Sequence, residues 1–189
     1  MACNRIVNAI TQAFIGEKPI KALLDPYNPT GSSIHVNFST SKARRWQTDS
    51  RKCHVNWVIL DSDWEAEFCR IAESNKRVIA YVKNQGLGLE IPYRYQSHTR
   101  KYYPDFIVLI DDGRSESDPL RLIVEIKGIH GEDARDKRLT MENYWVPGVN
   151  RMGKYGRWAF LELSDPFQMR TEFEEWVEKA VDKKEEDEV

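Results

Sequence analysis

Two apolar runs separated by a polar turn constrain the fold of this chain more than any other feature. The first run is Phe106–Ile110 and the second is Leu120–Val124. Between them, residues 111–119 are dense in Asp, Gly, Ser and Pro, which favour turns. This pattern predicts a β-hairpin whose strands are buried and whose loop is solvated.

Charged residues stand at the open end of this hairpin. Asp105 begins the first run, while Glu125 and Lys127 close the second. A hairpin symmetric about Ser115 places position 105 opposite position 125, and the period of two puts Glu125 and Lys127 on one face. We therefore expect two carboxylates and one ammonium group to converge.

Two facing carboxylates repel each other unless a cation lies between them. Magnesium binds carboxylate and phosphate oxygens and keeps several waters, one of which can attack a phosphodiester. Lys127 would orient that water, help deprotonate it and stabilise the charge that develops on the phosphate. A simple salt bridge at the hairpin rim also explains the residues. Acid-x-Lys triplets arise by chance, as Asp182-x-Lys184 in the polar tail illustrates.

The composition fits a folded domain in a reducing compartment. A length of 189 residues with 41% hydrophobic residues is sufficient for one domain with a real core. The three cysteines show no C-x-x-C spacing, which argues against a disulfide framework or a zinc site and fits a reducing cytoplasm. No apolar run reaches membrane length, so we expect neither a signal peptide nor a membrane span.

The net charge of -2 conceals an uneven distribution. Residues 171–189 contain nine acidic residues and three lysines, a charge of -6, so residues 1–170 carry +4. Basic clusters can neutralise nucleic-acid phosphates without reading sequence, although a solvated surface is the simpler explanation of any single cluster. The clusters are Lys42, Arg44, Arg45, Arg51 and Lys52, then Arg94, Arg100 and Lys101, and finally Arg151, Lys154 and Arg157.

The N-terminal part reads as an attachment to the main domain. Residues 4–15 have weak helical spacing, and the Pro- and Gly-containing stretch 25–31 reads as a linker. Alternating apolar residues at 34–38 could pair with the run at 55–60 as a hairpin. We expect residues 1–50 to be an extension or linker, residues 51–182 the main domain, and residues 183–189 a frayed acidic tail.

A helix is expected from about residue 62 to residue 75. Ser62 and Glu65 have capping-box spacing, and Trp64, Phe68 and Ile71 recur at helical spacing behind them. Glu65 lies at the edge of the buried stripe, where it could point toward the carboxylates. A capping role alone also explains this residue.

The rest of the chain completes an α/β pattern. The order of helix and strands implies a mixed sheet covered on both faces. We expect strands at 87–95 and 158–163, a helix at 132–144, and a last helix that starts at Asp165-Pro166.

An ordered set of short strings resembles a known family. The chain resembles the C-terminal nuclease domain of type III restriction enzyme Res subunits and related helicase-nuclease restriction proteins, over about residues 34–165. The strings are Asp61-Ser62-x-Trp64-Glu65, Tyr81-Val82-Lys83-Asn84, Ile91-Pro92-Tyr93, Tyr103-Pro104-Asp105-Phe106 and Glu125-Ile126-Lys127-Gly128.

The resemblance implies the PD-(D/E)xK restriction-endonuclease-like fold, in which a central mixed β-sheet flanked by helices holds the active site at one rim. By this likeness Asp105 and Glu125 bind Mg²⁺, for which Mn²⁺ can substitute, and the carbonyl of Ile126 adds a ligand. Lys127 is then the catalytic lysine. Glu65 matches the acidic residue on the helix before the sheet and counts as both a catalytic and a metal-binding candidate.

The implied activity is Mg²⁺-dependent hydrolysis of DNA phosphodiesters, leaving 5′-phosphate and 3′-hydroxyl ends. Candidate contacts to double-stranded DNA are Arg94, Arg100, Lys101 and Lys137, although a solvated helix surface is the simpler role for Lys137. The same residues would also suit a nuclease for branched or damaged DNA. A nuclease-fold module that binds DNA or has a structural role without cleavage is the other alternative.

The chain lacks the G-x-x-x-x-G-K-[ST] loop that cradles ATP phosphates, so it cannot itself be the translocating motor. In the resembling family, helicase domains precede the nuclease, and a methyltransferase subunit recognises the DNA site. We therefore expect a cleavage module that takes its targets from such partners. Homodimer formation would allow it to cut both strands.

Overall fold

The computed structural model describes residue 24 and residues 30–95, 98–127 and 133–187, with the side chains described as far as Asp182. The helix expected at residues 4–15 and most of the linker expected at 25–31 lie outside the described residues. Glycine 128 of the last family string also lies outside them.

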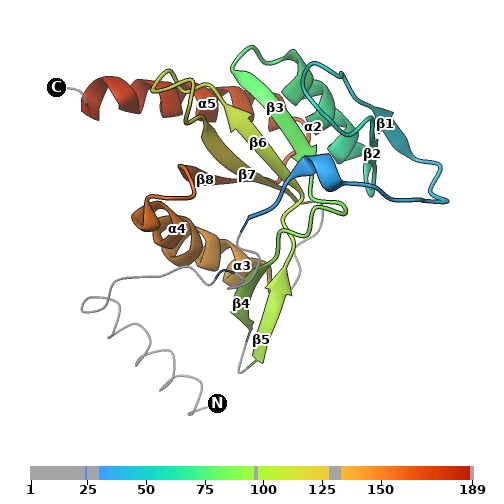
Figure 1. The fold of residues 1–189 in the computed structure, drawn as a ribbon, viewed down its shortest axis with the longest axis horizontal. Helices are drawn as coiled ribbons and strands as arrows, with labels where there is room; N and C mark the ends of the chain where they lie inside the picture. The colour runs from blue at the N-terminus through green and yellow to red at the C-terminus, as the bar shows by residue number, and fades with distance from the viewer. Residues whose placement is uncertain (1–23, 25–29, 96–97, 128–132, 188–189) are drawn as a thin grey trace.

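A four-stranded mixed sheet forms the centre of the fold (Figure 1). Its order is β3-β6-β7-β8, in which β3, β6 and β7 are antiparallel and β8 runs parallel to β7. This arrangement confirms the mixed α/β fold. The strands are β3 (Val78–Lys83), β6 (Phe106–Ile110), β7 (Leu120–Ile126) and β8 (Trp158–Leu163).

The register of the β6–β7 hairpin agrees with the sequence prediction. Phe106 pairs with Val124 and Ile110 pairs with Leu120, so the hairpin is symmetric about Ser115. One step beyond the first pair, position 105 faces position 125.

Both faces of the sheet are covered, which explains why β7 is almost continuously apolar. Leu122 and Val124 enter one core and Ile123 enters the other. Helices on either side of the sheet complete these cores (Figure 1). They are α2 (Asp63–Ser74) and α5 (Met169–Asp187) on the first side, with α3 (Ala134–Thr140), the π-helical η2 (Met141–Trp145) and α4 (Val146–Met152) on the second.

The expected strand at 87–95 is shorter and lies elsewhere. It begins at Ile91 as β4 (Ile91–Tyr95) and pairs only with β5 (His98–Tyr102), a strand that the sequence reading missed. The Asn84 side chain bonds both backbone groups of Leu89, its amide donating to the carbonyl at 2.7 Å and its oxygen accepting from the N–H at 3.1 Å. Because this turn directs the chain away from the sheet, β4 and β5 form a separate two-stranded ribbon that projects from the body (Figure 1).

The hairpin expected between residues 34–38 and 55–60 was wrong. The partner of β2 (Trp57–Ile59) is β1 (Arg45–Gln47), and the first segment contains only the short 3-10 turn η1 (Ser33–His35). Trp46 explains the choice, since its indole packs against the first core and donates to Glu73 Oε1 at 3.2 Å.

Helix α2 confirms the predicted cap with one difference. The Ser62 hydroxyl accepts from the Glu65 N–H at 3.3 Å, as a capping box requires. The Glu65 carboxylate, however, accepts the N–H of Asp61 at 2.8 Å. In a capping box the Glu65 carboxylate would accept the N–H of the N-cap residue Ser62, but here it accepts the N–H of the preceding residue.

Two helices have different limits from those expected. Helical structure runs without interruption from Ala134 through η2 to Met152, beyond the predicted 132–144. The last helix begins at Met169, because Asp165 forms a turn in which its carboxylate accepts the Phe167 N–H at 2.8 Å. Its helical backbone continues to Asp187, and fraying of residues 183–189 stays a prediction.

Arg157 ties the start of β8 to the hairpin loop, and it is therefore a structural residue instead of a free phosphate contact. Its guanidinium donates to the buried Asp112 and, at 3.1 Å, to Asp118, which Arg121 also contacts at 2.9 Å. Gly156 packs against Arg121 so closely that a Cβ would overlap the guanidinium.

We predict that Gly156→Ala lowers the thermal midpoint more than Gly153→Ala. Both glycines have a positive φ (75° and 69°), but a Cβ at Gly153 meets nothing within 4 Å. The left-handed backbone costs both variants about 1 kcal/mol, and only Gly156→Ala must also displace Arg121. Thermal unfolding followed by circular dichroism measures the difference, and equal midpoints would contradict the close approach.

Candidate active site

Asp105 and Glu125 meet at the edge of the sheet where β6 begins and β7 ends. Asp105 Oδ2 accepts the backbone N–H of Ile126 at 2.8 Å, and Glu125 Oε2 accepts the Tyr102 hydroxyl at 2.6 Å. Their other oxygens, Asp105 Oδ1 and Glu125 Oε1, accept no hydrogen bond from the part of the chain that the structure describes. The two carboxylates thus share one site, and each keeps one oxygen without a hydrogen bond from the described residues.

Burial and mutual repulsion disfavour the ionised form of this pair. Burial raises the pKa of Glu125 to about 8, and the Asp105 charge adds to this effect. Burial likewise raises the pKa of Asp105 to about 6, although the bond from Ile126 N–H opposes the rise. The pair retains protons near neutral pH that isolated carboxyls would release.

Lys127 lies beside the pair but bonds to a third carboxylate. Its Nζ is 2.6 Å from Glu162 Oε2, and the two side chains are only 12% and 13% exposed. Glu162 comes from β8, where the parallel register places it next to Glu125. The sequence allowed a simple salt bridge at the hairpin rim as an alternative, and Lys127 does form a salt bridge there. Its partner is Glu162, a residue that the sequence reasoning missed. A lone acidic residue within the apolar run 158–163 was the available signal.

Glu65 approaches from α2 and is 5% exposed. Its Oε2 accepts from Lys83 Nζ at 2.7 Å, and its charge helps to raise the pKa of Asp105. Lys83 lies at the end of β3 and was also missed, because no pattern along the chain links it to Glu65. The roles of Glu65 in catalysis and in metal binding stay predictions.

Lys137 is half-buried beside the site, with 32% of its side chain exposed. Its ammonium lies 5.7 Å and 5.8 Å from the ring centroids of Tyr93 and Tyr102, and it pairs with Asp133 at 3.3 Å. Its charge favours ionisation of Glu125 and so lowers the pKa of that carboxyl. Helix α3 thus directs this cation toward the site.

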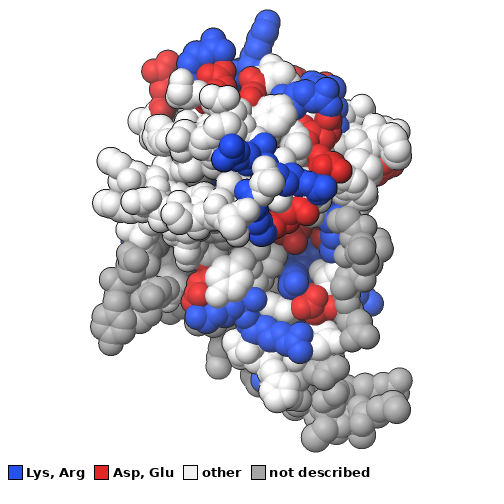
Figure 2. Space-filling model, turned by 90° about the vertical axis from the view of Figure 1, so that its right-hand side faces the viewer, with Lys and Arg blue, Asp and Glu red and all other residues white. Residues whose placement is uncertain are grey.

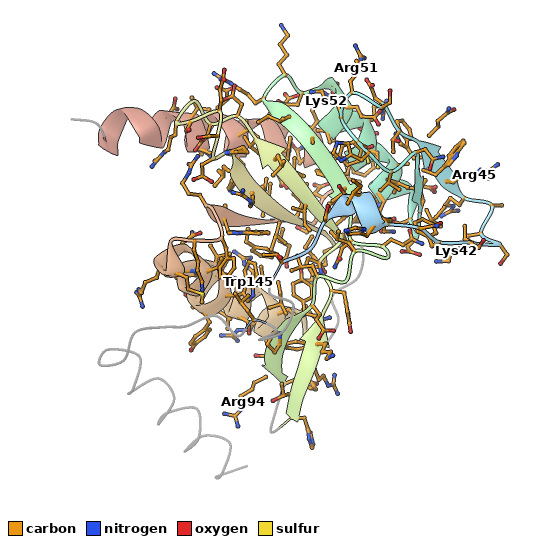
Figure 3. All side chains as sticks on the ribbon, in the orientation of Figure 1. Lys42, Arg45, Arg51, Lys52, Arg94 and Trp145 are labelled. Atoms are coloured by element: carbon orange, nitrogen blue, oxygen red, sulfur yellow. The ribbon has the colours of Figure 1, made fainter. Side chains whose placement is uncertain are left out.

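The other DNA-contact candidates lie on the β4–β5 ribbon. Arg100 stacks over Tyr95 at 4.4 Å, Lys101 pairs with Glu90 at 2.7 Å, and Arg94 points away from the body of the protein (Figure 3). Tyr102, at the base of the same ribbon, contacts Glu125. The ribbon therefore joins a basic surface to the carboxylate pair.

The first basic cluster is largely engaged with nearby acids and carbonyls. Lys42 pairs with Asp61, Arg51 pairs with Asp49, and Lys52 donates to two backbone carbonyls. Figure 3 shows that Lys42 and Arg51 point to different sides of the molecule.

In Figure 2, acidic side chains lie in a hollow at mid-height with Lys and Arg side chains above and below them.

The residues present fit a magnesium ion with few protein ligands. Among the described residues, no group of three or more His, Cys, Asp or Glu side chains is arranged to hold a metal ion. Magnesium commonly uses one or two carboxylates and completes its shell with water and phosphate oxygens. Asp105 and Glu125 supply two such carboxylates, and a cation bound between them would relieve the repulsion within this half-buried pair.

We predict that Glu125→Gln is more stable than the parent protein at pH 8.5 and equally stable near pH 4. A carboxyl whose pKa is raised by folding makes stability fall as pH rises from the unfolded value, about 4.3, toward the folded value. Removing that ionisation should gain at least about 1 kcal/mol at pH 8.5, or about 2–4 °C in the thermal midpoint. The measurement is thermal unfolding across this pH range in a chelating buffer.

Glu178→Gln, at an exposed position on α5, is the matched control and should show no such pH dependence. A Glu125→Gln protein that loses stability at pH 8.5 would refute repulsion within the pair.

Within the described residues, no helix combines the length and the apolar character needed to cross a membrane.

Comparison with known proteins identifies the family. No match was found among the curated proteins or among the solved structures. The family model described as an endonuclease domain matches residues 51–146 and so includes Asp105, Glu125 and Lys127. Because this match covers just over half of the 189 residues, the chain belongs to the endonuclease domain family.

Proposed function

We propose that this chain is a Mg²⁺-dependent DNA endonuclease domain and the cleavage module of a type III-like restriction enzyme. The observation that carries the proposal is the half-buried pair Asp105 and Glu125 at the sheet edge of an endonuclease-family chain. Family membership supports nuclease chemistry, and the donor set supports a hard divalent ion that contacts phosphate.

Asp105 and Glu125 would hold the ion, with the carbonyl of Ile126 as a further ligand. When bound, the ion supplies a Lewis acid for the phosphate and lowers the pKa of a water molecule. The hydrogen bonds from Ile126 N–H and Tyr102 O–H fix one oxygen of each carboxylate, so the other oxygen of each is free to bind. This preorganisation limits the entropy that binding must overcome.

Lys127 would position the attacking water and stabilise charge on the phosphate. Water adds to phosphorus, the bond to the 3′-oxygen breaks, and the water proton replaces phosphorus on that oxygen. The products are a 5′-phosphate and a 3′-hydroxyl. Glu162 orients the Lys127 ammonium beside the site through their 2.6 Å contact.

The substrate in this proposal is double-stranded DNA held by the basic ribbon. Arg94, Arg100 and Lys101 fall within thirteen residues, 91–103, that contain no acidic residue. Lys137 would contribute from α3. A helicase or translocase domain and a methyltransferase subunit would deliver the target site, and a homodimer would cut both strands.

A DNA-binding module without cleavage is the second candidate. The observation that favours it is the closed ion pair between Lys127 and Glu162, since a lysine engaged in this way is not free for a phosphate. The same experiment separates the two functions, because the second candidate binds DNA but leaves it intact.

We predict metal-dependent nicking of supercoiled plasmid by the parent protein and a loss of at least about 100-fold in Asp105→Asn and Lys127→Ala. Lys76→Ala, at an exposed turn between α2 and β3, is the matched control and should cut like the parent. Circular dichroism checks that each variant is folded. Parent-level cutting by Asp105→Asn would reject the site, and binding without cutting by the parent would favour the second candidate.

We predict that Arg94→Ala weakens DNA binding equally for unrelated sequences. Because the variant has one phosphate-binding cation fewer, the slope of log affinity against log salt should decrease by about 0.9. Fluorescence anisotropy with two unrelated duplexes over a range of salt concentrations measures this slope. Arg170→Ala on α5 is the control, because Arg170 pairs with Glu174 on the far side of the sheet from the ribbon. An unchanged slope for Arg94→Ala would exclude this arginine from the DNA interface.

A further inference from the structure

The Lys83 ammonium group is enclosed by three oxygen atoms beside the candidate active site. Its Nζ donates to Ile59 O at 2.8 Å and, at 2.7 Å each, to Asp61 Oδ2 and Glu65 Oε2. The Lys83 side chain is 10% exposed. An ammonium group has three donors, so this environment uses all of them.

This group is next to Asp105 in the fold. Lys83 pairs with Phe106 in the β3–β6 register, and the N–H of Asn84 donates to the Asp105 carbonyl at 2.8 Å. Glu65, Lys83 and Asp61 all act electrostatically on the Asp105 carboxyl. The sheet edge therefore has two neighbouring groups of carboxylates, and among the described residues only the Asp61–Glu65 group is bonded directly to a lysine.

We propose that Lys83 Nζ is the built-in cation of the Asp61–Glu65 group, so that the site takes a single divalent ion, at Asp105 and Glu125. This inference rests on the proposed function. It also assigns Glu65 as the partner of Lys83 in place of the metal-binding role expected from the resemblance.

The energetics of the ion pair support this assignment. The Glu65 side chain is 6% exposed, and separation of a buried ion pair leaves an uncompensated charge, which is strongly destabilising. A divalent ion in the same position would have to displace this ammonium group from all three of its oxygen partners. Glu65 also accepts the N–H of Asp61 with the same Oε2 atom, which fixes its orientation toward Lys83.

The test is calorimetric titration of the full chain with Mn²⁺ in the absence of DNA. We expect the parent to bind one ion per chain, Asp105→Asn to bind it at least about 100-fold more weakly, and Lys83→Met to gain a second ion. Lys42→Met is the matched control. Lys42 also pairs with Asp61 but is 59% exposed, and its variant should still bind one ion.

A charge-neutral pair of changes separates a ligand from an ion-pair partner. Glu65→Gln alone removes one of the two carboxylates that face Lys83, and the added positive charge should weaken Mn²⁺ binding through repulsion. The double variant Lys83→Met/Glu65→Gln removes both charges and should return to within about threefold of the parent affinity. This variant leaves no unpaired charge at the two positions, so it tests the inference even if Lys83→Met fails to fold.

Three results would overturn the inference while leaving the proposed function intact. They are two ions bound by the parent, one ion bound by a folded Lys83→Met, and a double variant as weak as Asp105→Asn. A parent protein that binds no Mn²⁺ would overturn both the inference and the proposed metal-dependent function.

Discussion

The register of the β6–β7 hairpin is the constraint on which the site depends. On β7, Leu122 and Val124 enter the first core while Ile123 enters the second, and the buried residues of β6 enter the first core. A slip of one residue would move Ile123 into the core that holds Leu122 and Val124, where different helices pack. The packing that stabilises the domain therefore also fixes Asp105 opposite Glu125.

Charge compensation at the sheet edge is unequal, and this inequality defines the site. Lys127 pairs with Glu162, Lys83 pairs with Glu65 and Asp61, and Lys42 pairs with Asp61 as well. Asp105 and Glu125 have hydrogen bonds from neutral donors instead, and burial raises the pKa of both carboxyls. Carboxyl groups with raised pKa values that lie close together are typical of functional sites, because their repulsion lowers stability. Among these carboxylates, Asp105 and Glu125 are therefore the ones whose repulsion an external cation would relieve most.

The sequence predicts the local parts of this arrangement well. Apolar periodicity and turn residues are enough for the hairpin about Ser115, for β8, and for α2 with its Ser62 cap. Asp105 and Glu125 follow from the hairpin because their separation is set by one turn. The fold class follows from the order of these elements together with the family resemblance.

What the sequence could not supply depends on contacts between distant segments. Trp46 selects the partner of β2 through a bond to Glu73 on α2, and alternation at 34–38 gives no hint of it. The separation of β4 and β5 from the sheet depends on a side-chain turn at Asn84. Glu162 meets Lys127 only after a helical crossover returns β8 parallel to β7.

The ribbon links the two functions that the proposal assigns to this surface. Its inner face carries Ile91, Tyr93 and Tyr102, which pack in the second core, while Arg94 and Lys101 alternate with them on the outer face. Tyr102 both anchors the ribbon and donates to Glu125. A ligand that moved the ribbon would break the bond that orients this carboxylate, so an ordered site requires a fixed ribbon. This dependence explains why a basic, projecting element has a buried tyrosine at its base.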